Sequence, residues 1–225
     1  MKPQISRIIF LFTSLLTLST GTFAQLQVSQ EPHHHPVIVN DYLRLLDVWI
    51  EPGDTTKFHV HSTPSLFVQL TTRDISTQIK SESWIPEKSE AGKTWYKAFK
   101  PDILFHRVCN NDTSAFHVLA IELLKPYDSK LGIATSPLPY PVYLDNEKAF
   151  VYKLDHGLVE GMNIIGRGPI VAVLVSGGPI SAENLFAGEP SEMKAGQFIY
   201  MEPGASYHFK CKEKGDLNLI LFELK

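Results

Sequence analysis

The sequence predicts an all-β protein in which one structural unit occurs twice. Short apolar runs rich in Val, Ile, Leu and Phe recur along the chain, and such runs are typical of β-strands. Pro52-Gly53, Gly177-Gly178 and Pro203-Gly204 separate these runs as turns. The second half of the chain also repeats features of the first half. The clearest expected strands are 43–50, 65–71, 116–124, 170–176, 198–201 and 217–224.

The internal repeat decides the expected organisation of the chain. Residues separated by 102 positions match as Ser89/Ser191, Glu90/Glu192, Pro101/Pro203, His106/His208 and Cys109/Cys211. Upstream, His35-Pro36-Val37 matches Tyr140-Pro141-Val142. We therefore expect one domain over 25–125, a proline-rich linker over 126–141, and a second domain over 142–225.

Residues 1–24 are expected to form an export signal. Lys2 and Arg7 supply positive charge, 8–18 is mostly apolar, and Thr22-Phe23-Ala24 offers a cleavage site after about Ala24. The apolar run is too short to cross a bilayer comfortably. The mature protein is therefore predicted to be periplasmic or secreted, without membrane insertion.

Charge and cysteine content narrow the possible partners. The chain has 21 Lys and Arg against 24 Asp and Glu, for a formal net charge of −3. The two signs are interspersed, which gives no reason to expect a nucleic-acid partner. Two cysteines, Cys109 and Cys211, are too few for a disulfide framework. At equivalent repeat positions they are expected to form either one disulfide or two separate buried thiols.

Histidine spacing predicts a metal site in the first half. His59 and His61 are one residue apart, so on a strand they point to the same side. His106 precedes Asn110 at the start of a later apolar run. Gly53-x5-His-x-His together with His-x3-Asn resembles the paired motifs of the cupin superfamily. This resemblance implies two tandem antiparallel jelly-roll barrels of the cupin type, with a divalent metal held by His59, His61 and His106.

The resemblance is incomplete at one ligand, and this bears on the chemistry. Cupins often place a glutamate four residues after the second histidine, where this chain has Ser65. Three neutral imidazoles would leave the ion's charge uncompensated and coordination positions open. Cupins of this kind include iron(II) dioxygenases, so the resemblance favours Fe(II) over Zn, Mn, Ni or Cu, and oxidation of a small organic molecule. A non-catalytic small-molecule or sugar-binding module, or a zinc-dependent isomerase or hydrolase, is the alternative, and no catalytic residue is assigned.

Strand parity nominates the residues around the metal. Ser65, Phe67 and Gln69 share the parity of the two histidines, and Gln69 is either a substrate contact or an ordinary strand amide. Four aromatic residues either wall a pocket or fill the core: Trp49, Trp95, Tyr96 and Phe99.

The remaining histidines are given lesser roles. His33-His34-His35 is interpreted as an N-terminal arm, the alternative being a role at the mouth of the site. His117 is expected to be a packing residue. In the second half Ile164 and Gly166 replace the paired histidines, so His208 is expected to be a hydrogen-bonded residue of a degenerate barrel. The protein is expected to be a monomer or a homodimer.

Overall fold

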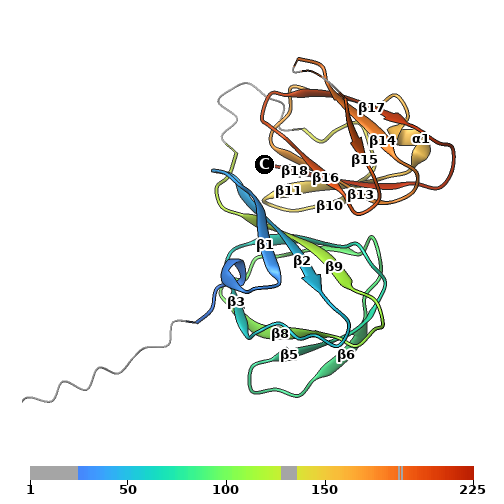
Figure 1. Ribbon diagram of the computed structural model, residues 1–225. Coiled ribbons are helices and arrows are strands. Elements are labelled where there is room, and N and C mark those ends of the chain that lie inside the picture. Colours follow the sequence, from blue (N-terminus) through green and yellow to red (C-terminus); the bar gives the residue numbers. More distant parts are fainter. Residues whose placement is uncertain (1–24, 128–135, 187, 189) are drawn as a thin grey trace, which may run out of the picture.

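Figure 1 shows two β-barrels joined in tandem. This computed structural model describes residues 25–127, 136–186, 188 and 190–225. Apart from the 3₁₀ turn η1 (Val28–Gln30) and the short helix α1 (His156–Val159), its regular elements are strands. The expected all-β fold is therefore confirmed. The proposed export signal lies outside the described residues.

The first barrel consists of two antiparallel sheets. The five-stranded sheet has the order β1-β2-β9-β4-β7, formed by β1 (His34–Val39), β2 (Leu43–Ile50), β9 (Phe116–Leu123), β4 (Ser65–Gln69) and β7 (Thr94–Lys97). The four-stranded sheet has the order β3-β8-β5-β6, formed by β3 (His59–His61), β8 (Leu104–Asn110), β5 (Asp74–Ile79) and β6 (Ile85–Lys88).

The second barrel repeats this topology strand for strand. One sheet has the order β10-β11-β18-β13-β16 and the other β12-β17-β14-β15. Their strands are β10 (Val142–Asp145), β11 (Ala149–Leu154), β12 (Asn163–Ile165), β13 (Ile170–Ser176), β14 (Ile180–Asn184), β15 (Ser191–Met193), β16 (Phe198–Met201), β17 (Ser206–Cys211) and β18 (Asn218–Leu224). Adding nine to each strand number of the first barrel gives the second, which confirms the internal repeat.

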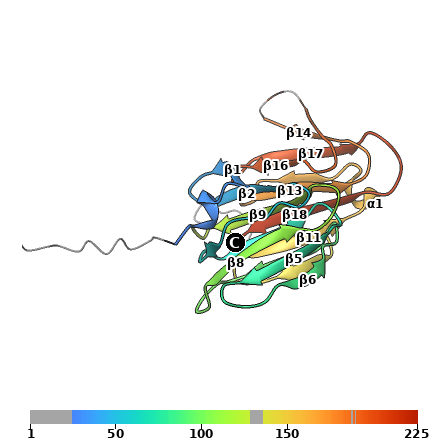
Figure 2. The same ribbon diagram turned by 60° about the horizontal axis from the view of Figure 1, so that its bottom comes forward.

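A shared core joins the two barrels where their five-stranded sheets face each other (Figures 1 and 2). It combines side chains of β2, β4 and β9 with those of β11, β13 and β18. Its fully buried members include Leu45, Leu66, Ile121, Val151, Val171 and Phe222. Strands with both faces covered read as continuous apolar runs, as Ile170–Ser176 does.

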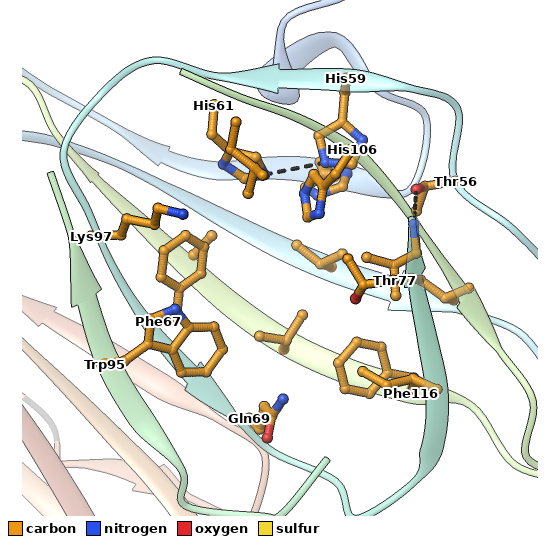
Figure 3. A pocket seen from close by; sticks show the side chains of 18 of the residues that line it. Thr56, His59, His61, Phe67, Gln69, Thr77, Trp95, Lys97, His106 and Phe116 are labelled. Carbon is orange, nitrogen blue, oxygen red and sulfur yellow. Dashed lines mark hydrogen bonds between the residues drawn. The ribbon is translucent and has the colours of Figure 1, made fainter. Parts of the chain in front are cut away.

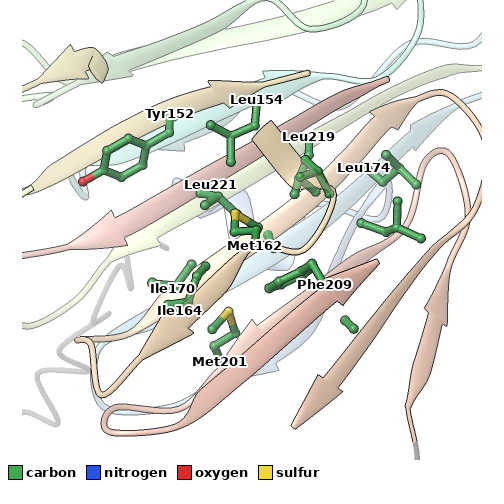
Figure 4. Close-up of a cluster of buried hydrophobic side chains, with 14 of the residues drawn as sticks. Tyr152, Leu154, Met162, Ile164, Ile170, Leu174, Met201, Phe209, Leu219 and Leu221 are labelled. Atoms are coloured by element: carbon green, nitrogen blue, oxygen red, sulfur yellow. The ribbon is translucent and has the colours of Figure 1, made fainter. Parts of the chain in front are cut away.

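The interior of the second barrel is filled by apolar side chains (Figure 4). Ile164 and Phe209 are fully buried there, together with Met162 and Met201. Ile164, which replaces His59 in the repeat, pairs across the sheet with Tyr207. Apolar side chains thus fill the space that corresponds to the histidine cluster of the first barrel.

The sequence alignment of His106 with His208 is wrong by one residue. His59 faces His106 across the sheet in the first barrel, whereas Ile164 faces Tyr207 in the second. Side chains alternate along a strand, so a slip of one residue moves each to the other face. His208 is half-buried and bonds to the Oδ1 of Asn163 at 2.9 Å, as a hydrogen-bonded residue unrelated to a metal site.

Both cysteines are free thiols, so the disulfide alternative does not hold. Cys109 pairs with Ser76 in the first barrel, whereas Cys211 packs against the interior cluster of the second. They are not equivalent, for the same reason that His106 and His208 are not. Across the described residues, no helix is long and apolar enough to cross a membrane.

Candidate metal centre

Three histidines from two neighbouring strands meet inside the first barrel (Figure 3). His59 and His61 lie on β3 and are 1% and 4% exposed. His106 on β8 is the cross-strand partner of His59, with ring centroids 4.7 Å apart. The rings of His61 and His106 are 5.0 Å apart. The structure thus brings together all three histidines that the sequence nominated, on the wall of a cavity of about 380 Å³.

The separation of two imidazole nitrogens suits a common ion. The Nε2 atoms of His59 and His61 lie 3.2 Å apart. Two nitrogens that bind the same ion at about 2.1 Å, with tetrahedral or octahedral angles at the ion, lie roughly 3.0–3.4 Å apart. The Nδ1 of His59 donates to the Lys57 carbonyl at 2.9 Å. Because a carbonyl oxygen can only accept, this bond places the proton of His59 on Nδ1. The lone pair of Nε2 is then free to face His61.

His106 carries two buried nitrogen atoms without a hydrogen-bond partner. Both Nδ1 and Nε2 are enclosed, and neither meets a donor or acceptor among the described residues. A buried polar group left unpaired costs about 1–3 kcal/mol. A ligand of the imidazole would remove part of this cost, so the residue fits a metal site better than a purely structural position.

His34 is the member of the site that sequence reasoning missed. It begins β1 and is 8% exposed, so the N-terminal-arm interpretation is wrong for this residue. Its ring lies 4.6 Å from that of His59. One nitrogen each of His34, His59 and His61 can be chosen so that all lie within 4.8 Å of one another, and these three could hold a metal ion. Side chains alternate along a strand, so the three successive histidines cannot all face the same way. Of the three, His34 lines the cavity.

A buried carboxylate orients His34. Glu31 is 1% exposed, and its Oε2 lies 2.7 Å from the Nδ1 of His34. It also accepts from the Nδ1 of His33 and from the backbone N–H of Lys57. Burial raises the pKa of Glu31, but the bonds from His34, His33 and Lys57 outweigh it and hold that pKa well below its usual range. An ionised Glu31 keeps the proton of His34 on Nδ1 and leaves Nε2 free to bind an ion.

Replacing this carboxylate is expected to weaken metal binding. The Glu31→Gln substitution keeps the side-chain size but removes the charge that fixes the tautomer of His34. Loss of such an outer partner costs roughly 10- to 100-fold in metal affinity. Competition with a chelator of known affinity would measure the change.

Asp54→Asn provides the matched control. Asp54 is exposed and bonds to the Nε2 of His33 at 3.0 Å, but not to His34. We expect its substitution to change metal affinity by less than about threefold, since it touches none of the cavity histidines. Equal losses in the two variants would show that Glu31 acts only through general charge.

Burial keeps His59, His61 and His106 neutral. It lowers the pKa of His59 to about 4 and that of His106 to about 3. The pKa of His61 also lies well below its usual value, first because of burial and then because protons on His61 and His106 would repel each other. Neutral imidazole is the form that binds metal, so protons compete weakly for these nitrogens at neutral pH.

The metal-free protein is expected to lose stability on acidification. Unfolded histidines take up protons below about pH 6.5, whereas His59 and His106 stay neutral in the folded state until about pH 4 and 3. The unfolded state therefore binds more protons between these values, and each buried histidine removes at most about 1.4 kcal/mol per pH unit. His33 opposes this trend, because its carboxylate partners Asp54 and Glu31 raise its pKa against burial.

Urea unfolding between pH 7 and 5 would test this expectation. The midpoint should fall with pH in the metal-free protein. The fall should be shallower in a His59→Ala/His106→Ala variant, which lacks two of the neutral imidazoles. A wild-type midpoint that does not change with pH would contradict the assignment of neutral buried histidines.

Most of the other residues that the sequence nominated around the metal line the cavity, but Ser65 does not. Phe67, Gln69, Trp95 and Phe99 line the cavity. Ser65 is fully buried but outside the lining, and its hydroxyl donates to the Thr63 carbonyl at 2.8 Å.

Alternation along the strands places the remaining aromatic residues outside. Trp49 is 40% exposed and stacks on His117 at 3.7 Å. His117 also bonds to Asp47 at 2.6 Å, as expected of a packing residue. The hydroxyl of Tyr96 donates to Glu147 at 2.6 Å, between the two barrels.

A second group of possible ligands lies in the second barrel but fits a metal poorly. It consists of His156, Glu160 and Cys211. Burial, followed by the charge of Glu160, raises the pKa of the Cys211 thiol to about 11. A thiol that keeps its proton is a weak metal ligand.

Comparison with known proteins shows likeness in structure but not in sequence. No family model and no curated protein matches the chain. A cupin domain from Bordetella pertussis is 20% identical and covers 44% of this chain and 96% of its own, with a TM-score of 0.37. AerE from Microcystis aeruginosa is 12% identical and covers 87% and 98%, with a TM-score of 0.53. Salicylate 1,2-dioxygenase from Pseudaminobacter salicylatoxidans is 11% identical and covers 81% and 71%, with a TM-score of 0.56.

The similarities to AerE and to salicylate 1,2-dioxygenase, at such low identity, show the fold alone. The chain has the fold of a two-barrel cupin, with antiparallel jelly-roll barrels in tandem. Its first barrel holds a buried histidine cluster that could bind a metal ion.

Proposed function

We propose that the first barrel binds one divalent metal ion and oxidises a small organic molecule with dioxygen. The observation that carries this proposal is the buried group of His34, His59 and His61, which could hold a metal ion. The ring of His106 lies 4.7 Å from that of His59 on the wall of the same cavity. Imidazole suits Fe, Zn, Cu and Ni. When bound, such an ion would supply the means to bring substrate and dioxygen together. The structural likeness to a dioxygenase supports a reaction with dioxygen, and the resemblance of the histidine motifs to those of iron(II) cupins favours iron(II).

The protein's own residues would position the substrate and exclude water. His59 and His61 hold their nitrogens at ligand spacing before any ion arrives. Phe67, Trp95 and Phe99 form apolar walls, which keep water from the reacting atoms. Insertion of both oxygen atoms into one substrate balances without an external reductant. This role therefore requires no further electron donor.

Oxygen uptake separates this function from its alternatives. Metal-free protein would be loaded with Fe(II) or with Zn(II) and incubated with hydroxybenzoates, and isotopically labelled dioxygen would be traced into the product. We expect label in the product of the iron form and none with zinc. Turnover by the zinc form without oxygen would replace this proposal with an isomerase or hydrolase. Ligand-dependent stabilisation without turnover in either form would replace it with a binding module.

The same account extends to location. The apolar segment 8–18 near the N-terminus supports export of the protein. Mass spectrometry of the protein recovered from its native host tests this part. A mature N-terminus near Gln25 is expected, and a retained Met1 would contradict export.

A further inference from the structure

We propose that the cavity takes a flat, single-ring carboxylic acid, with its carboxylate beside Lys97 and a hydrogen-bonding group at the opposite end beside Gln69. This inference rests on the proposed function, because it names the substrate class of the same site. It follows from three features of the lining: an amide NH₂ group without a protein partner among the described residues, a stacked pair of aromatic rings, and a lysine with no ion-pair partner among them. Figure 3 shows Gln69 at the far end from the histidines, with Phe67 and Trp95 between them.

Gln69 offers an amide NH₂ group that has no protein partner in the described chain. The side chain is 4% exposed and lines the cavity. Its oxygen accepts from the backbone N–H of Glu90 at 2.9 Å. A backbone N–H can only donate, so this bond fixes the amide orientation. The Nε2 group is therefore free to donate into the cavity that Gln69 lines. An acceptor on a bound molecule would satisfy it.

The walls of the cavity suit a planar ring. Phe67 and Trp95 stack with centroids 4.8 Å apart and planes inclined by 10°. Phe99 stacks on His61 at 5.1 Å and 20°, which extends the aromatic surface to the histidines. Flat faces favour offset stacking with another aromatic ring. A cavity of about 380 Å³ lies at the small end of the range for ligand sites, in keeping with one ring.

Lys97 gives the cavity a positive charge near the histidines. Its Nζ lies 5.4 Å from the ring centroid of Phe99. The residue is largely exposed, and Figure 3 shows its side chain on the same side of the cavity as the histidines. Within the described part of the chain, no carboxylate lies within ion-pair distance of Lys97. Neutral imidazoles would not offset the charge of an ion. An anion is therefore the better complement at this end.

The acidic group in the lining does not cancel this charge. Glu87 accepts from the hydroxyl of Thr77 at 2.9 Å, whereas a second lysine, Lys93, also lines the cavity. Together with a divalent ion, the two lysines give the lining an excess of positive charge. A carboxylate would meet both the ion and Lys97, while the ring extends toward Gln69.

Matched probes separate the three contacts. Binding to the zinc-loaded protein would be measured by calorimetry, because zinc permits no oxidation. We expect 4-hydroxybenzoate to bind more tightly than benzoate, 4-hydroxybenzamide or cyclohexanecarboxylate. These comparisons isolate the far-end group, the negative charge and the flat ring, respectively. Equal affinity for the carboxylate and its amide would overturn the proposal.

Two variants assign the contacts to residues. Lys97→Met should weaken 4-hydroxybenzoate about three- to fivefold and the matched amide less than about twofold. Gln69→Leu should weaken 4-hydroxybenzoate roughly three- to tenfold and leave benzoate nearly unchanged. Lys80→Met is the control, because Lys80 lies 4.5 Å over Phe105 and does not line the cavity. Equal effects of Lys97→Met and Lys80→Met would overturn the role of Lys97.

Metal content measured on the same samples keeps the two proposals distinct. Zinc-loaded, folded protein that binds none of the probes would overturn the substrate class and leave the metal centre standing. Protein that takes up no metal would instead overturn the proposed function. Thermal unfolding of each variant confirms that it is folded before its affinity is compared.

Discussion

Replacing His106 by alanine is expected to abolish stoichiometric metal binding without destabilising the metal-free protein. The residue has two buried nitrogens with no hydrogen-bond partner in the part of the chain that the structure describes, and it lines an existing cavity. Its removal therefore breaks no hydrogen bond and relieves two unpaired groups. We expect metal affinity to fall by at least about 100-fold, since loss of an outer partner alone costs 10- to 100-fold. The free energy of unfolding should change by less than about 1 kcal/mol.

His117→Ala is the matched control, with the reverse outcome. His117 is 4% exposed, but its ring bonds to Asp47 and stacks on Trp49 outside the cavity. This variant should keep its metal and lose about 1–3 kcal/mol of stability. Equilibrium dialysis and urea unfolding would measure both quantities. Stoichiometric, tightly bound metal in His106→Ala would exclude this residue as a ligand.

Phe222→Ala is expected to destabilise both barrels together by about 3–5 kcal/mol. Phe222 lies on β18 of the second barrel and is fully buried in the shared core, which also contains Leu45 and Ile121 of the first. Deleting a buried phenyl group removes its burial energy and leaves a cavity. Because this core belongs to both barrels, neither should unfold alone.

Tryptophan fluorescence can test this coupling. All three tryptophans, Trp49, Trp84 and Trp95, lie in the first barrel. The fluorescence midpoint in urea should therefore fall although the substitution lies in the second barrel. Phe186→Ala, at a side chain that is 81% exposed, should change it little. An unchanged fluorescence midpoint in Phe222→Ala, with loss of circular dichroism, would show independent barrels.

The part of the fold that sequence could predict depended on local patterns. The strands β2, β13 and β16 have the bounds expected from their apolar runs, because burial on both faces makes such runs continuous. The pair His59 and His61 followed from strand alternation alone. These features need no knowledge of distant contacts.

What sequence reasoning missed depended on register and on contacts between distant segments. The sequence alignment matched His106 with His208, but the structure matches it with Tyr207. Matching residues within one strand do not reveal a change in loop length before the next strand, so the register there was wrong by one residue. His34 was missed because it reaches His59 from a strand twenty-five residues earlier in the chain. The bond between His34 and Glu31 could have been predicted from the sequence, because His34 lies only three positions after Glu31.

Metal content is the most direct test of the central claim. The protein would be purified without an affinity tag, supplied with Fe(II) or Zn(II), and analysed by elemental mass spectrometry beside a His59→Ala/His106→Ala variant. The account predicts about one ion per wild-type chain and almost none in the variant. Wild-type protein that stays metal-free after reconstitution, or a variant that retains the wild-type amount, would contradict it.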